Sequence, residues 1–173
     1  MTSVQRRFIL HWGEMGARWG INRTVAQIHA LLYLAPAPLT ADQIAESLTV
    51  ARSNVSTSLR ELQGWGIVRV VHVLGERRDR FESIKEVWEM FQIIVDERKR
   101  REIDPTIALL QSCLAETSQR GKADAYTMER LKEMSAFFET MSSAYTEARR
   151  LPLSLVKGVA KTRGRLAKLL EFK

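Results

Sequence analysis

The sequence of 173 residues contains one cysteine, Cys113, and three scattered histidines. A single cysteine excludes an internal disulfide framework, and neither residue type occurs at the spacing of a metal site. Cys113 lies in an apolar helical pattern, which favours a small buried side chain over a redox sensor. We therefore expect no metal site and no bound cofactor.

Long apolar runs are also lacking. No run approaches the roughly 18 residues that a membrane-spanning helix needs, and the N-terminus has no apolar signal-peptide core, because Phe8, Ile9 and Leu10 are soon followed by His11 and Glu14. These absences predict a cytoplasmic protein without a membrane partner.

Catalytic signatures are missing as well. The sequence has no glycine-rich phosphate loop, no recognisable Ser/His/Asp or Cys/His arrangement, and no carboxylate pair in a cleft pattern. We expect no catalytic residues and no enzyme activity.

The most informative segment covers residues 40–82. Thr40 and Gln43 form a capping-box pattern, which predicts a short helix from Ala41, with an apolar stripe that includes Ile44 and Leu48. A second helical pattern follows within a few residues, with Val55, Leu59 and Leu62 as its buried stripe. Two short helices joined by a tight turn indicate a helix-turn-helix.

The second helix would expose short hydrogen-bonding side chains and arginines. These are the residue types that contact base edges and phosphates in a major groove, although an ordinary solvated helix face has a similar composition. The candidate DNA contacts on this face are Arg52, Ser53, Asn54, Ser56, Thr57 and Arg60. Ala51 stands at the expected N-cap position, where an uncapped helix loses about 1 kcal/mol unless Ser53 or Thr49 replaces the cap.

A basic hairpin follows this helix. Gly64 and Gly66 end the helix, residues 67–73 alternate as a strand, and the chain returns through residues 80–82 after a polar turn. A helix-turn-helix followed by a basic hairpin predicts a winged helix. Arg77 and Arg78 would enter a minor groove, and Arg80 is a further candidate contact.

These residues also carry a resemblance. The run from Pro38 to Ser83, with "VWEMF" and "ERKRREIDP" after it, resembles the GbsR branch of the MarR-type winged-helix transcriptional regulators. The resemblance implies a mainly α fold, with a β-hairpin wing flanked by long terminal helices that pair two subunits. It also implies control by choline-like or osmoprotectant-related molecules.

The remaining chain divides into helical segments. We predict an N-terminal helix within residues 1–22 for packing or dimerisation, a winged-helix module over 23–83, and a helical dimerisation and regulatory region over 84–150. Within that region Asp104-Pro105 predicts a helix restart, with Asp104 as N-cap. A basic amphipathic helix over 151–173 holds six basic residues against one acidic residue, and it suits a dimer contact or, as an alternative, peripheral membrane binding.

The sequence thus predicts a homodimeric regulator that binds a roughly palindromic double-stranded DNA operator, most simply as a repressor, with a small-molecule effector as a further partner. An aromatic cage of Trp12, Trp19, Trp88 and Phe91 is the candidate effector site, although tryptophans on apolar helix stripes are more often core or dimer contacts. The alternative is an architectural winged-helix protein that tolerates any nucleic-acid sequence and has no effector.

Overall fold

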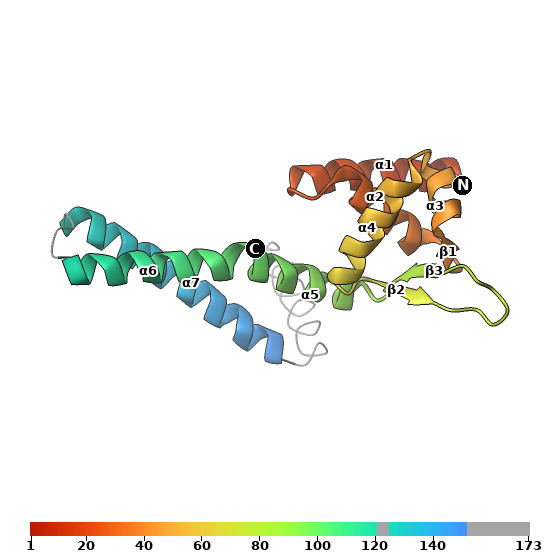
Figure 1. Cartoon of the computed structure of the whole chain (residues 1–173). Coiled ribbons are helices and arrows are strands. Elements are labelled where there is room, and N and C mark those ends of the chain that lie inside the picture. Colours follow the sequence, from red (N-terminus) through yellow and green to blue (C-terminus); the bar gives the residue numbers. More distant parts are fainter. Residues whose placement is uncertain (121–124, 152–173) are drawn as a thin grey trace, which may run out of the picture. The chain divides into compact units, whose positions relative to one another are not determined.

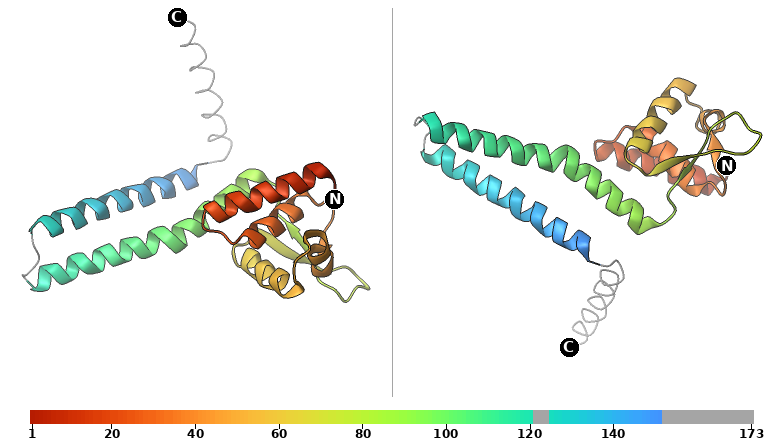
Figure 2. Two further views of the ribbon diagram at one scale, coloured as in Figure 1. Left: turned by 90° about the horizontal axis from the view of Figure 1, so that it is seen from above. Right: turned by 60° about the horizontal axis from the view of Figure 1, so that its bottom comes forward.

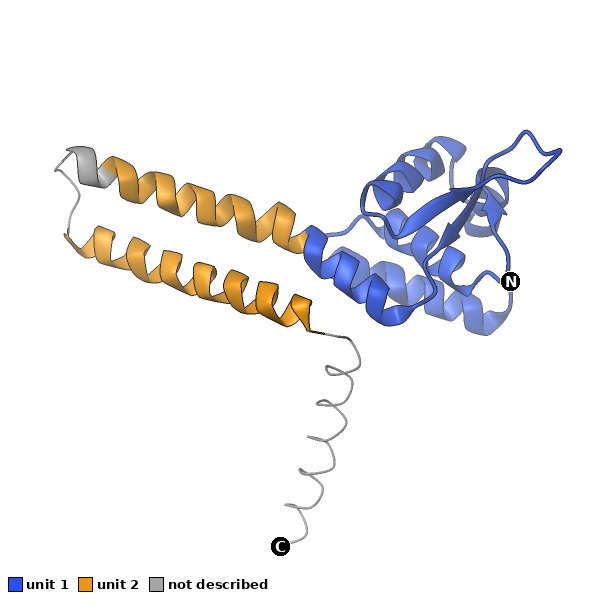
Figure 3. Cartoon of the chain, turned by 90° about the horizontal axis from the view of Figure 1, so that it is seen from below, with its two compact units in different colours: residues 1–97 blue, residues 98–173 orange. Residues whose placement is uncertain are grey.

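The computed structural model describes residues 1–120 and 125–151, apart from the side chains of residues 117–120. The chain forms two compact units, Met1–Glu97 and a second that begins at Arg98 (Figure 3). Almost all of the C-terminal helix expected over 151–173 lies outside the described residues.

The first unit contains five helices and a small sheet (Figure 1). Their order is α1 (Ser3–Arg18), α2 (Arg23–Leu34), β1 (Leu39–Thr40), α3 (Ala41–Leu48), α4 (Arg52–Gly64), β2 (Val68–Val71), β3 (Arg80–Ser83) and α5 (Val87–Arg98). The antiparallel sheet has the order β1-β3-β2, with Leu39 and Val70 flanking Phe81. The expected mainly α winged helix is therefore confirmed, and β1 is a strand that the periodicity did not reveal.

The core of this unit lies where α2, α3 and α4 meet the sheet. Ile28, Ile44, Val55 and Leu62 are completely or almost completely buried, and Ile67 extends the cluster toward the sheet. Each such side chain contributes about 1.5–3 kcal/mol by leaving water. The stripes read from the sequence on α3 and α4 are the faces that build this core, so the opposite face of α4 is left to solvent.

Helix α1 packs closely on α2, and glycine makes the approach possible. A Cβ atom added at Gly16 would lie 2.5 Å from the Cβ of Ala26, and one added at Gly13 would lie 2.6 Å from Cγ of Gln27. Real Cβ atoms do not approach that closely, so Gly16 requires glycine or a shift of α1, whereas at Gly13 the flexible side chain of Gln27 would have to move. The glycines of α1 therefore mark close helix packing.

The second unit starts with a π-helical turn, η1 (Lys99–Ile103), followed by α6 (Asp104–Arg120) and α7 (Ala125–Arg150). Helices α6 and α7 lie side by side and run in opposite directions (Figure 2).

The prediction of Asp104 as an N-cap was wrong. Its φ of −61° and ψ of −42° are helical, and η1 leads directly into it. A proline inside a helix lacks a donor and clashes with the carbonyl group four residues earlier. The wider π-helical turn before Pro105 relieves both problems, so the helix continues instead of restarting.

Candidate nucleic-acid interface

The turn between α3 and α4 fixes the direction of the exposed helix. At its start, the Thr40 hydroxyl accepts a hydrogen bond from Gln43 N at 3.2 Å, and Thr40 N donates to Oε1 of Gln43 at 2.8 Å, which is the predicted capping box. At its end, Thr49 adopts a left-handed conformation with φ of 55°. This conformation stops α3 and redirects the chain into α4.

The predicted contact face of α4 points into solvent. Arg52, Ser53, Asn54, Thr57 and Arg60 are exposed, and Ser56 is half-buried. Val55, Ser58, Leu59 and Leu62 are the buried side of the same helix. The helix therefore offers one continuous polar face of short side chains with an arginine at each end, as base and phosphate contacts require.

The first turn of α4 has no side-chain cap. Ala51 occupies the N-cap position with an extended backbone and makes no capping hydrogen bond, so neither Thr49 nor Ser53 replaces the missing group. The Arg52 guanidinium donates to the Ser56 hydroxyl, and this hydroxyl donates to Arg52 O at 3.2 Å. The amide groups at this helix end stay available to an incoming anion, which the helix dipole also favours.

The wing is held at its base by Arg80. Its Nε and Nη2 atoms donate to the two carboxylate oxygens of Glu76 at 2.6 and 2.8 Å, and Nη1 donates to Pro38 O at 3.1 Å. The hydrogen bonds between the side chains lower the pKa of Glu76 and raise that of Arg80. Arg80, predicted as a DNA contact, thus uses three donors inside the protein and orients the wing.

The tip of the wing carries the other two predicted arginines. The loop between β2 and β3 extends away from the helices of its unit, with Gly75 at φ of 83° (Figure 1). Arg77 and Arg78 are exposed, and the side chain of Leu74 is fully exposed. Exposed guanidinium groups on a narrow hairpin suit a minor groove.

A carboxylate that the sequence did not single out lies between the wing and α4. Asp42, the second residue of α3, accepts a hydrogen bond from Nε of Arg52 at 2.9 Å, and its other oxygen lies 3.5 Å from Nη1 of Arg78. Nothing in the local sequence pattern indicated that these three side chains would meet.

The four residues of the predicted effector cage do not surround one cavity. Trp12 and Trp19 line a cavity of about 40 Å³ between α1, α2 and the end of α4, together with Trp65 and His29. Trp88 and Phe91 are not in that lining and contact each other edge to face, with ring centroids 6.4 Å apart. Sequence reasoning missed His29 and Trp65 at this cavity, because neither carries a motif.

His29 is buried without a partner for its Nε2 atom within the described part of the chain. Burial, followed by repulsion from Lys85, lowers the pKa of His29 to about 4. Lys85 is fixed at the end of α2, where its Nζ atom donates to the carbonyl groups of Leu32, Tyr33 and Ala35 at 2.7, 2.8 and 2.8 Å. His29 is therefore neutral near pH 7, and it lines the cavity while its buried Nε2 atom stays unsatisfied within the described residues.

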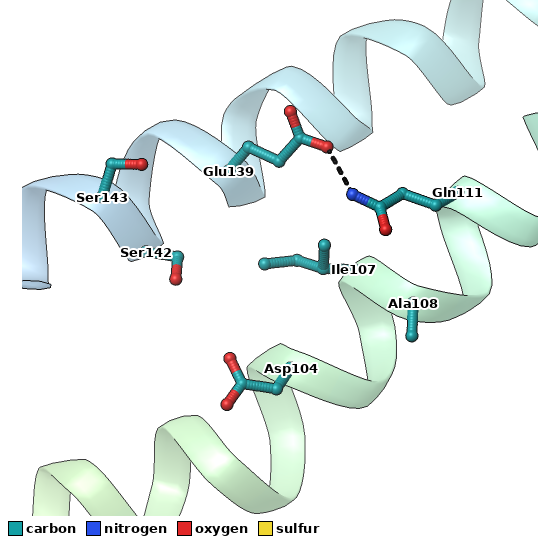
Figure 4. A pocket seen from close by; sticks show the side chains of 7 residues that line it. All are labelled: Asp104, Ile107, Ala108, Gln111, Glu139, Ser142 and Ser143. Atoms are coloured by element: carbon teal, nitrogen blue, oxygen red, sulfur yellow. Dashed lines mark hydrogen bonds between the residues drawn. The ribbon is translucent and has the colours of Figure 1, made fainter.

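An open pocket of about 360 Å³ lies between α6 and α7 in the second unit (Figure 4). At one side of the pocket, Gln111 donates a hydrogen bond to Glu139 at 3.1 Å, and Ser135 donates to the same carboxylate oxygen at 3.0 Å. Asp104, Ile107 and Ser142 line the remainder. The mixed lining and the hydrogen bond between helices are typical of a seam between two helices.

The fold and the exposed face together define a winged helix-turn-helix protein. Residues 19–79 match the model described as the MarR family, so this part of the chain is similar to MarR-type winged-helix modules, and the resemblance found in the sequence is confirmed. The match covers both helices of the helix-turn-helix and the tip of the wing.

Comparison with individual proteins gives the same result. The chain is 22% identical over 98 residues to the HTH-type transcriptional repressor GbsR of Bacillus subtilis (strain 168), a match that covers 57% of this chain and 54% of that repressor. The chain therefore spans about half the length of this relative. A crystal structure of a transcriptional regulator superposes with a TM-score of 0.63 at 21% identity, over 83% of this chain and 94% of that one.

A crystal structure of the S. aureus MepR-DNA complex is more distant. Its TM-score is 0.38 at 22% identity, over 66% of this chain and 98% of that one.

None of the helices in residues 1–120 and 125–151 is both long and apolar enough to cross a membrane.

Proposed function

We propose that the chain is a homodimeric, sequence-specific DNA-binding transcriptional regulator, a repressor whose operator affinity changes when a small molecule binds. The observation that carries the proposal is the exposed polar face of α4 beside a wing with exposed arginines. The name of the Bacillus subtilis relative supports the direction of regulation. A protein that binds chromosomal DNA must be in the compartment that holds the chromosome, so the proposal includes a cytoplasmic location.

The residues of this interface divide into two roles. Asn54, Arg60 and the short side chains between them are candidates for contacts with base edges, because they lie on the exposed face of α4. Arg77 and Arg78 are candidates for phosphate and minor-groove contacts. Arg80 acts indirectly, since its bidentate pair with Glu76 holds the wing.

The proposal of a dimer rests on the length of one reading helix and on exposed apolar side chains. One helix such as α4 reads only a few base pairs, whereas two copies about one helical turn (roughly 34 Å) apart read a palindrome. Met134, Phe137 and Met141 form a stripe on α7 and are 50%, 56% and 44% exposed. Such a stripe suits pairing with a second copy. Light scattering of the purified chain at micromolar concentration tests this, and a stable monomer contradicts it.

The effector proposal rests on the cavity beside His29. Three tryptophans give it an apolar wall, and His29, whose buried Nε2 atom has no partner among the described residues, belongs to the same lining. At about 40 Å³ the cavity holds little more than water, so a larger ligand would displace the half-exposed Trp19 and shift α1. Calorimetric titration with choline and with betaine tests the ligand class implied by the resemblance, and the absence of heat with both contradicts it.

The decisive experiment is selection of bound sequences from a random duplex pool near physiological salt. Enrichment of an inverted repeat with half-sites one turn apart supports a dimeric, sequence-specific regulator. Measurable binding without enrichment favours the architectural alternative, whose contacts would be to phosphates alone. No binding at all contradicts both.

A further inference from the structure

The carboxylate of Asp42 contacts two of the arginines that the proposed function assigns to DNA, Arg52 and Arg78. Oδ1 of Asp42 lies 2.9 Å from Nε of Arg52, and Oδ2 lies 3.5 Å from Nη1 of Arg78. Arg52 belongs to the first turn of α4 and Arg78 to the wing. Asp42 thus connects the two parts of the interface through separate oxygen atoms.

A DNA phosphate offers the same chemistry, namely a negative charge shared between oxygen atoms that accept from guanidinium groups. The three side chains are accessible to such a competitor, since Asp42, Arg52 and Arg78 are 58%, 51% and 70% exposed. A phosphate group that approaches these arginines either displaces the carboxylate of Asp42 or is repelled by its negative charge. Both effects oppose binding, and neither depends on the base sequence.

We propose that Asp42 is an autoinhibitory residue that lowers affinity for DNA of any sequence by holding Arg52 and Arg78 in the free protein. The inference rests on the proposed DNA-binding function. On an operator, base contacts from α4 are added to the phosphate contacts, so the complex stays stable although Asp42 must be displaced. On random DNA only the phosphate contacts are available, so the same cost leaves that binding weak.

The test is Asp42→Asn in the full chain, which removes the charge and keeps the size of the side chain. Each exposed ion pair contributes little, so we expect affinity for a random duplex to rise roughly three- to tenfold. Affinity for the selected operator should rise by a similar factor, because the cost of displacing Asp42 does not depend on the base sequence. The slope of log affinity against log salt on random DNA should steepen by about 0.9, because one more phosphate charge is neutralised.

Glu46→Gln is the matched control. Glu46 lies one turn further along α3, is exposed, and forms no ion pair with the arginines of the interface. It reports the effect of removing one negative charge from the same helix. Arg78→Gln, introduced into wild type and into Asp42→Asn, completes a double-mutant cycle. The loss of Arg78 should weaken binding to random duplex more in Asp42→Asn than in wild type. Thermal unfolding verifies that the variants remain folded.

The outcomes separate the inference from the function on which it rests. If the wild-type chain binds DNA and Asp42→Asn binds random duplex no better than Glu46→Gln, the inference is overturned and the function stands. A loss of affinity in Asp42→Asn also overturns it, because Asp42 would then orient the arginines for DNA. If neither the wild-type chain nor Asp42→Asn binds any duplex, the proposed function fails and the inference fails with it.

Discussion

Acidification should destabilise the first unit through His29 in particular. The folded chain holds the pKa of His29 at about 4, compared with 6.5 for the free side chain, because burial and Lys85 disfavour the charged form. Above about pH 7 the side chain is neutral in both states, and it contributes no pH dependence. Between pH 6.5 and 4 the unfolded chain binds a proton that the folded chain does not bind, so the free energy of unfolding decreases as the pH falls.

The size of this effect follows from the two pKa values. A pKa difference of one between the folded and unfolded chain corresponds to about 1.36 kcal/mol, so the full window removes about 3 kcal/mol of stability, a large share of that of a small unit. All four tryptophans lie within residues 1–97, and tryptophan fluorescence during urea unfolding therefore reports on this unit. The measurement compares wild type with His29→Leu at pH 7.5 and pH 4.5.

The difference between the two proteins isolates His29 from the carboxylates that also titrate in acid. We expect wild type to lose about 2–3 kcal/mol more than His29→Leu between these two pH values. His11→Leu, a change at an exposed histidine on α1, should retain the wild-type pH dependence. Equal losses in wild type and His29→Leu would refute the reasoning, because His29 would then titrate alike in both states.

Three further changes test the packing, the interface and the end of α2. Gly16→Ala should cost about 1–3 kcal/mol in urea unfolding, since its Cβ has no room, whereas Gly64→Ala, where nothing lies within 4 Å, should not destabilise the chain; equal effects would contradict the close packing of α1. Arg77→Ala should weaken binding to all duplexes and reduce the salt slope by about 0.9, whereas Arg60→Ala should mainly relax sequence preference in a pool selection; identical profiles would contradict the division of roles. Lys85→Met should lower the melting temperature, because three carbonyl groups lose a charged donor worth roughly 1.5 kcal/mol or more, and an unchanged melting temperature would contradict that role.

Much of the candidate site could be predicted from the sequence, because it follows from local rules. The outward face of α4 is fixed by the spacing of Val55, Leu59 and Leu62, which must point to the core. The absence of a cap at Ala51 could also be read directly, since alanine has no side-chain acceptor. The exposure of the wing arginines follows in the same way from a short hairpin. Whether these residues touch DNA remains a prediction.

The role of Arg80 could not be predicted in this way. Its position in a basic hairpin made it resemble Arg77 and Arg78, yet one of its partners is the carbonyl oxygen of Pro38, 42 residues earlier. That partner is present only because β1 pairs with β3 at this point. A two-residue strand has too few positions to show an alternating pattern, so the sequence did not reveal it.

The sequence by itself determined the helices of the module, the turn between them and the wing, because caps, apolar spacing and glycines act between residues that are neighbours along the chain. Tertiary structure alone decided that Asp42 meets Arg52 and Arg78, and that His29 loses its contact with water beside Trp12 and Trp65. These contacts join residues from different elements, and they exist only once the shared core has fixed how α1, α2, α3, α4 and the wing pack. The charge of a side chain can therefore be read from the sequence, whereas the partner that holds this charge is set by the packing.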